Sequence, residues 1–192
     1  GAGLIVVILS SVLHPYGFGL YRAEGRSDQL LPHVKRSTKM IMYIYSGFVL
    51  SGIIMYLLAG MNTFDAINHS MTALSTGGFS TKPESIGYWN SLPIEIVTYI
   101  LMILGTTNFA THFVLIKGKV KIFFRNGEIR LLGILLIIFI PLIAYFTLSE
   151  IYPLMPQALR RGIFEVISAI STTGFSLGTF LDWNLFGIFA II

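Results

Sequence analysis

Two short, glycine-bearing stretches of the sequence have residue types that could coordinate a cation through backbone oxygens. We name them by their shared glycines: the Gly78 turn is Ser75-Thr76-Gly77-Gly78-Phe79-Ser80, and the Gly174 turn is Ser171-Thr172-Thr173-Gly174-Phe175-Ser176. Aligning the two glycines gives an offset of 96 residues, at which five of the six positions are identical. One such turn could be an ordinary helix cap, but two matched copies predict an internal repeat with a shared function.

The chemistry of these turns lies in their backbone. In an extended Thr-x-Gly segment the carbonyl oxygens can point one way and replace the hydration shell of a permeating cation. Glycine matters because it adopts backbone angles closed to other residues. We therefore expect an ion path lined by Ser75, Thr76, Gly77, Gly78, Ser171, Thr172, Thr173 and Gly174. Phe79 and Phe175 are expected to support the turns by packing, and the Thr76 and Thr172 hydroxyls could instead brace the preceding helix.

Each turn follows a helical segment that is too short to cross a bilayer. The segments are Thr63–Ser75 and Pro156–Ser171, each three or four helical turns long. The first begins with a polar N-cap, Asn62 or Thr63, and the second with a proline in its first turn. A short helix that ends in a glycine-bearing turn between two spans predicts a re-entrant loop. Irregular backbone at membrane depth is tolerated only where it is buried in protein or lines a water-filled cavity.

The composition indicates a membrane protein. Of 192 residues 54% are hydrophobic and 11% charged, whereas about a quarter of the residues of a soluble domain are charged. Three nearly uncharged segments have the ~20 residues that a helix needs to span the hydrocarbon core: Met40–Gly60, Pro93–Ile116 and Ile129–Leu148. There is no cysteine, and no nucleophile and base spacing or metal-ligand cluster. We therefore expect an all-α integral membrane protein that is neither an enzyme nor dependent on a cofactor.

The basic residues predict the orientation in the membrane. Ten of the 13 lysines and arginines lie in two alternate connections, before the first predicted span and between the second and third. By the positive-inside rule both connections face the cytoplasm, and the segments that hold the turns face outward. The net charge of +4 is then a signal of multi-pass topology and does not indicate nucleic-acid binding.

Two spans separate the turns, so both copies have the same orientation in the membrane. A parallel repeat of span, half-helix, turn and span suits a pore built around an axis along the membrane normal. The chain begins and ends in apolar runs of about half a span, Leu4–Leu13 and Asn184–Ile192, and we expect a fragment of a longer protein. The predicted parts are the end of a first repeat with a cytoplasmic loop (1–38), a second repeat (39–116), a cytoplasmic loop (117–128) and a truncated third repeat (129–192).

Two pairs of charged or titratable residues occupy corresponding places in the short helices. Asp65 and His69 are spaced i, i+4 in the first, and Arg161 and Glu165 in the second. Such pairs usually stabilise their own helix by a few tenths of a kcal/mol. The alternative is that Asp65 and Glu165 make the outer mouth negative and concentrate cations there. Glu95, at the start of a span, is expected to be solvated at the interface.

The two turns, each after a short helix, resemble the pore loops of the Trk/Ktr/HKT-type potassium transporters. The segments Leu20–Glu24 and Gly105–Ala110 also resemble sequence of that family, and the resemblance covers the whole chain. It implies a subunit with four pore-loop repeats around a pseudo-fourfold pore. This chain would then hold the end of repeat one, repeat two and most of repeat three.

The resemblance also implies a function and partners. It implies uptake of potassium across the inner membrane of a prokaryote, with K⁺ bound only at the filter residues. It further implies a homodimer of the full-length subunit and a cytoplasmic nucleotide-binding regulatory subunit. One alternative is a sodium-coupled or sodium-permeable transporter of the same architecture. The others are a broken-helix secondary transporter, which calls for midplane carboxylates and inverted repeats, and a membrane scaffold, which gives no reason for two matched turns.

The topology predicts which introduced cysteines a membrane-impermeant thiol reagent reaches. Cysteines at Arg26 and Gly118 should be labelled only from the cytoplasmic side, and cysteines at Glu84 and Tyr152 only from outside. Since the chain has no native cysteine, each label reports a single position. Labelling of the Gly118 variant from outside would overturn the orientation.

Overall fold

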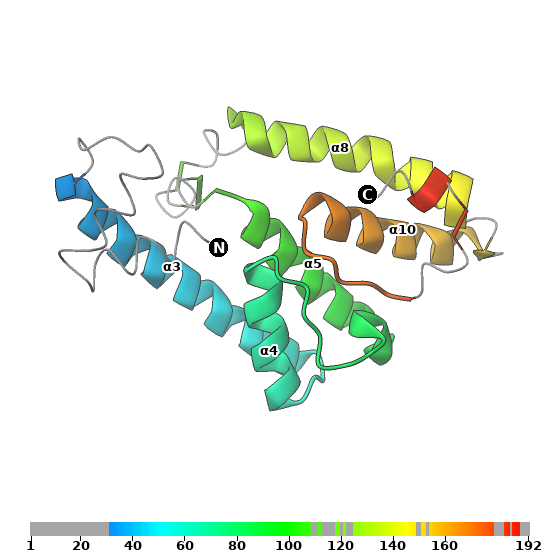
Figure 1. The fold of residues 1–192 in the computed structure, drawn as a ribbon, viewed down its shortest axis with the longest axis horizontal. Coiled ribbons are helices and arrows are strands. Elements are labelled where there is room, and N and C mark those ends of the chain that lie inside the picture. Colours follow the sequence, from blue (N-terminus) through cyan, green and yellow to red (C-terminus); the bar gives the residue numbers. More distant parts are fainter. Residues whose placement is uncertain are drawn as a thin grey trace. The chain divides into compact units, whose positions relative to one another are not determined.

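The structure is a computed structural model that describes residues 31–108, 111–112, 118–119, 121, 125–148, 151–152, 154–178, 183–184 and 186–188, with side chains from residue 41 onward. Every regular element in these residues is helical (Figure 1). The chain divides into two compact units, residues 1–47 and 48–192, and the second unit holds both turns. The predicted half span at 4–13, the segment Leu20–Glu24 and residues 189–192 lie outside the described residues.

Each turn is preceded by a long helix and a short one. The elements before the Gly78 turn are α3 (Leu31–Leu58) and α4 (Thr63–Leu74), and those before the Gly174 turn are α8 (Gly127–Ile143), the π-helix η3 (Ala144–Leu148) and α10 (Met155–Ile170). Both short helices begin as predicted. The Asn62 side chain accepts a hydrogen bond from the Asp65 N–H at 2.9 Å, and Pro156 lies in the first turn of α10.

The helix expected over Pro93–Ile116 is interrupted, so the prediction of one continuous span is wrong there. The α5 helix covers Leu92–Thr106, and the backbone of Thr107 is extended. The Thr107 hydroxyl donates to the Ile103 carbonyl at 2.7 Å, the same oxygen that the Thr107 N–H reaches at 3.2 Å as the last helical bond. The break frees the carbonyl of Leu104, and His112 Nε2 lies 2.8 Å from that oxygen. The His112 side chain thus partners one carbonyl that the break leaves without its helical donor.

Within the described residues, two helical stretches are long and apolar enough to cross a membrane, Ile41–Leu58 and Gly127–Thr147. Only 11% of each stretch is buried inside the protein. The exposed face of α8 carries large aliphatic side chains, namely Leu131, Ile134, Ile137 and Ile138. An apolar helix in a soluble protein would bury such a face, so this exposure fits a lipid-facing surface.

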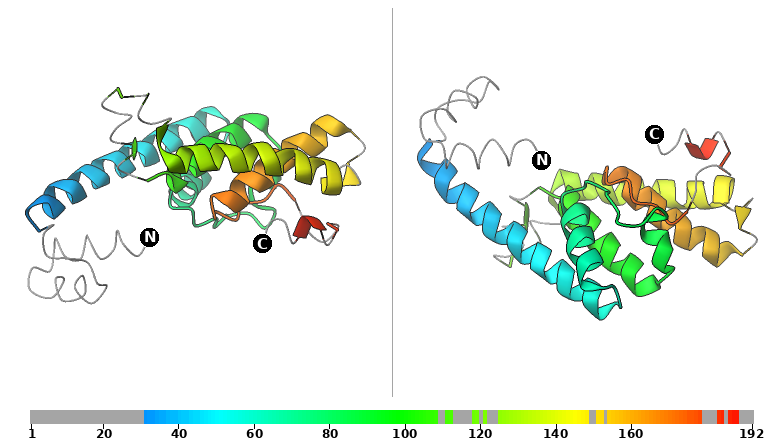
Figure 2. Two further views of the ribbon diagram at one scale, coloured as in Figure 1. Left: turned by 90° about the horizontal axis from the view of Figure 1, so that it is seen from above. Right: turned by 60° about the horizontal axis from the view of Figure 1, so that its bottom comes forward.

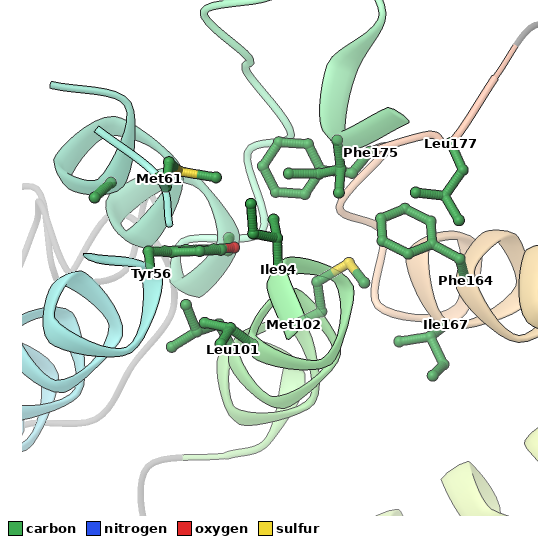
Figure 3. Packing of buried hydrophobic residues seen from close by; sticks show 13 residues of the cluster. Tyr56, Met61, Ile94, Leu101, Met102, Phe164, Ile167, Phe175 and Leu177 are labelled. Atoms are coloured by element: carbon green, nitrogen blue, oxygen red, sulfur yellow. The ribbon is translucent and has the colours of Figure 1, made fainter. Parts of the chain in front are cut away.

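The α5 helix joins the two copies of the repeat, because both short helices, α4 and α10, contact it. Figure 2 shows this arrangement from two further directions. The buried hydrophobic cluster is continuous across the copies: Figure 3 shows Tyr56 of α3, Leu101 of α5, Phe164 of α10 and Phe175 of the Gly174 turn within it. The helices that precede the two turns therefore share this core.

A glycine allows α3, α4 and α5 to approach closely. A Cβ at Gly52 would overlap the Ser70 hydroxyl of α4 and the Leu101 side chain of α5. That hydroxyl donates to the Val49 carbonyl of α3 at 2.8 Å. Both neighbours are buried, so neither has free space to move into.

We expect Gly52→Ala to destabilise the complete protein by about 1–3 kcal/mol, the usual cost of overpacking. The matched control is Gly133→Ala on α8, where no atom of the described residues lies within 4 Å of the added methyl group. Because alanine has the higher helix propensity, the control should unfold at the same temperature as the parent or higher. Thermal unfolding in detergent measures both, and equal stability of the two variants would contradict the close packing at Gly52.

Candidate functional site

The two turns close with the same backbone hydrogen bonds. In the Gly78 turn, the Thr76 N–H donates to the Ala73 carbonyl at 3.2 Å and the Gly77 N–H to the Thr72 carbonyl at 2.8 Å. At an offset of 96 residues, the N–H groups of Thr172 and Thr173 donate to the carbonyls of Ala169 and Ser168, both at 2.9 Å. This pair of bonds is the Schellman motif, which ends a helix and satisfies its last carbonyls. The repeat predicted from sequence thus extends to individual hydrogen bonds.

Both turns place a threonine in the left-handed region of backbone angles. The φ angles are 52° at Thr76 and 57° at Thr172, and those of the glycines are 65° at Gly78 and 85° at Gly174. A β-branched residue in this region is a genuine outlier, and such a conformation costs of order 1–3 kcal/mol. Glycine normally occupies this helix-ending position. The presence of threonine in both copies indicates that the turns carry a functional constraint.

Three consecutive carbonyl oxygens in each turn have no donor among the described residues. Among the hydrogen bonds of the described residues, none is accepted by the carbonyls of Thr76, Gly77, Gly78, Thr172, Thr173 or Gly174. By contrast, the N–H groups that open each turn are bonded to the short helix. Carbonyl oxygens at membrane depth need water or a ligand, because lipid offers no donor. The turns therefore present acceptors that suit a cation.

The two turns are direct neighbours. A Cβ at Gly78 would overlap the carbonyl oxygen of Thr173 in the other turn, so only glycine fits there. At Gly174 the corresponding space is open, because no atom of the described residues lies within 4 Å of the place that a Cβ would occupy. The structure thus brings the predicted ion-path residues of both copies together.

The two turn phenylalanines have different surroundings. Phe175 is 1% exposed and stacks on the ring of His69 in α4, with centroids 5.7 Å apart. Phe79 is 76% exposed. Phe175 thus packs between the copies, whereas the packing role expected for Phe79 stays a prediction.

The charged pair of α10 binds the segment that leaves the Gly174 turn (residues 176–178). Arg161 Nη1 donates to the Leu177 carbonyl at 2.6 Å, and Glu165 Oε1 accepts from the Leu177 N–H at 2.8 Å. The two side chains therefore hold the backbone of Leu177 on both sides, through its N–H and its carbonyl. The helical spacing of the two residues predicted a bond between them, and their contacts with Leu177 could not be read from that spacing.

The pair in α4 binds the corresponding segment after the Gly78 turn (residues 80–82). Thr81 donates to Asp65 Oδ1, Lys82 Nζ lies 3.5 Å from Asp65 Oδ2, and Ser80 Oγ lies 2.9 Å from His69 Nε2. The other ring nitrogen of His69 lies 2.8 Å from the Asp65 carbonyl, so the imidazole is bonded at both ends. Asp65 and Glu165 are 2% and 4% exposed and have partners within the protein. A role at the outer mouth stays a prediction for both.

An ion pair between the two copies was not predicted from the sequence. Glu95 at the start of α5 is 1% exposed, which corrects the expectation of a solvated carboxylate. Arg160 of α10 donates to it through two nitrogens, with Nε–Oε2 at 2.8 Å, and its Nη2 also lies 3.3 Å from Asn90 Oδ1. The sequence feature that could have indicated the pair is that Glu95 and Arg160 are oppositely charged residues, each near the start of a helix on the predicted outer side.

The connection between the Gly78 turn and α5 also supports the other turn. Its 3₁₀-helix η2 (Ser85–Trp89) bonds to Ser176 in both directions. The Gly87 N–H donates to the Ser176 carbonyl at 3.2 Å, and the Ser176 N–H donates to Ser85 Oγ at 3.2 Å. The preceding copy thus binds α10, through Glu95 and Arg160, and the last residue of the Gly174 turn, through η2 and Ser176.

We expect Glu95→Gln to weaken this contact between copies. Loss of a charge-assisted bond should lower the stability of the complete protein by about 1.5–3 kcal/mol. Glu84→Gln is the matched control, because Glu84 is exposed and such substitutions change stability by less than about 0.5 kcal/mol. Thermal unfolding in detergent compares the two variants. An unchanged unfolding temperature for Glu95→Gln would show that the ion pair contributes nothing.

Comparison with known proteins places these turns in a family. Residues 4–136 match the family model described as "TrkH: Cation transport protein". The chain belongs to the TrkH family. Two similar relatives are named Trk system potassium uptake protein TrkH: that of Halomonas elongata is 34% identical and that of Escherichia coli K12 31%. The alignments cover 93% and 97% of this chain and 39% and 40% of the relatives.

A solved structure extends the similarity to three dimensions. The crystal structure of the potassium transporter TrkH from Vibrio parahaemolyticus matches with a TM-score of 0.79 and 28% identity, over 98% of this chain and 40% of that one. The chain thus spans about two fifths of the relatives it matches. The predicted all-α membrane fold with pore-loop repeats is confirmed, as is the assignment to a Trk-type family and to a membrane. The relatives carry the names of transport proteins and not of enzymes.

Proposed function

We propose that the complete protein takes up potassium through a pore lined by the carbonyls of residues 75–78 and 171–174. The observation that carries this proposal is the matched pair of turns. The first amides of each turn are bonded to its short helix, and the carbonyls at 76–78 and 172–174 accept no hydrogen bond within the described residues. Carbonyl oxygens arranged in this way replace the hydration shell of a cation. The names of the relatives, which are potassium uptake proteins, support potassium as the ion.

The short helices favour a cation at the same place. The C-terminal end of a helix carries about half a negative charge, and both α4 and α10 end directly at a turn. Two partial negative charges therefore add to the carbonyl dipoles. No cofactor is needed for this chemistry, since the ion is the transported ligand.

The wider assembly is part of the proposal. Residues 39–116 and 129–192 form the second and third of four repeats, with 1–38 and 117–128 cytoplasmic in part or whole. The protein is multi-pass in the inner membrane of a prokaryote. It pairs as a homodimer and binds a cytoplasmic nucleotide-binding regulatory subunit through its basic inner surface. The family resemblance and the two basic connections support these assignments.

The turn glycines test the proposed function. Gly78→Ser and Gly174→Ser should each weaken the selectivity of uptake for potassium over sodium, because a side chain is strained at these positive φ angles. Gly78→Ser should have the larger effect, since its Cβ also displaces the Thr173 carbonyl of the neighbouring turn. Uptake of K⁺ and Na⁺ is measured in cells that lack their own potassium uptake, at equal amounts of membrane protein.

Gly118→Ser is the matched control for these variants. Gly118 also has a positive φ, of 72°, but it lies outside the turns, and no atom of the described residues is within 4 Å of an added Cβ. It should keep the parental selectivity. Unchanged selectivity in both turn variants would falsify the assignment of the turns as the ion path.

A further inference from the structure

One hydroxyl side chain in each short helix bonds to the far side of its turn. Thr72 Oγ1 of α4 donates to the Phe79 carbonyl at 2.9 Å. Ser168 Oγ of α10 donates to the Phe175 carbonyl at 2.6 Å. Thr72 and Ser168 correspond at the offset of 96 residues, as do the two phenylalanines. The bond is therefore repeated although the residue type is not.

The same two residues also bond to the near side of each turn. The Thr72 carbonyl accepts the Gly77 N–H at 2.8 Å, and the Ser168 carbonyl accepts the Thr173 N–H at 2.9 Å. A serine hydroxyl adds a contact to each of these carbonyls, from Ser75 at 3.4 Å and from Ser171 at 3.1 Å. One residue of the short helix thus joins both sides of its turn.

The hydroxyl bond separates two kinds of carbonyl. The Phe79 and Phe175 oxygens are bonded to the short helix and so are directed toward it. The carbonyl of each preceding glycine accepts no hydrogen bond within the described residues. The row of free carbonyls therefore ends at Gly78 in one turn and at Gly174 in the other.

We propose that Thr72 and Ser168 are positioning residues for ion selectivity. By binding the phenylalanine carbonyl, each hydroxyl fixes the peptide that follows the phenylalanine. Through the phenylalanine backbone this restrains the preceding peptide, which carries the glycine carbonyl. The inference rests on the proposed function, because it concerns which carbonyls face the ion. Neither hydroxyl touches the ion itself.

The hydroxyl to phenylalanine carbonyl bond is the same in both copies. The other side-chain bonds to the far side of each turn differ between the copies. At corresponding positions one turn earlier in each helix, His69 binds the Ser80 side chain, whereas Glu165 binds the Leu177 backbone. Those contacts hold residues 80–82 and 176–178 through different chemical groups in the two copies. The hydroxyl to phenylalanine carbonyl bond joins corresponding atoms in both copies, next to the proposed ligands.

The test removes each hydroxyl and then restores it in the other copy's form. Thr72→Val and Ser168→Ala lack the donor, whereas Thr72→Ser and Ser168→Thr keep it. Ser70→Ala is the matched control: it removes a hydroxyl of α4 that binds Val49 of α3 and not the turn. All variants are made in the complete protein, and K⁺ and Na⁺ uptake are measured at equal membrane abundance together with thermal unfolding.

We expect Thr72→Val and Ser168→Ala to lower the potassium over sodium uptake ratio by about 3–10-fold, equivalent to one net hydrogen bond. Thr72→Ser, Ser168→Thr and Ser70→Ala should stay within about twofold of the parent, since each keeps the bond to the phenylalanine carbonyl. If Thr72→Val does not reach the membrane, Thr72→Ala and the Ser168 variants decide the question.

Three results would overturn the inference. The first is parental selectivity in the variants without the hydroxyl while Gly78→Ser loses it, which would leave the proposed function intact. The second is an equal loss in Ser70→Ala, which would indicate general packing. The third is parental selectivity in both the hydroxyl and the glycine variants, in which case the proposed function fails as well.

Discussion

The rest of the structure depends on one constraint: each turn must bond its first amides to the short helix and still leave the carbonyls of residues 76–78 and 172–174 without a donor from the described residues. In water this would need no special arrangement, because solvent would supply donors to any oxygen. At membrane depth only protein groups, a ligand or confined water can do so. In the Schellman motif, N–H groups of the turn donate hydrogen bonds to the last carbonyls of the short helix. The arrangement has a conformational cost, because it places Thr76 and Thr172 at positive φ angles.

To keep such a turn rigid, contacts are needed on both of its sides. The two copies supply these contacts to each other. The Gly174 turn follows α10, which the Arg160–Glu95 ion pair binds to the other copy, and its last residue, Ser176, bonds to η2. Its phenylalanine stacks on His69 of the other copy. The Gly78 turn lies directly against the Thr173 carbonyl. The copies are therefore parts of one packed unit, and a change in either is expected to move the other.

The sequence predicts local features of this chain well and contacts between its copies poorly. The N-cap at Asn62, the proline at the start of α10 and the matched turns follow from residue types within a few positions of one another. The Glu95–Arg160 pair joins residues of different copies, and no local pattern connects them. The helix expected over Pro93–Ile116 ends at Thr106, and the ring of His112 bonds to the Leu104 carbonyl eight residues back. Hydropathy, which responds to the average over a span, does not detect such a break.

The stacking of His69 on Phe175 has a consequence during synthesis of the chain, because His69 is made well before Phe175. The two residues are 106 positions apart in the sequence, so at about 5–20 residues per second the ribosome needs about 5–20 s to supply the second after the first. During that interval α4, with its buried aspartate and histidine, lacks part of its packing partner. A polar half-helix of this kind is poorly suited to lipid. We therefore expect α4 to remain out of contact with lipid, in a hydrated environment, until the second copy has been synthesised and packs against it.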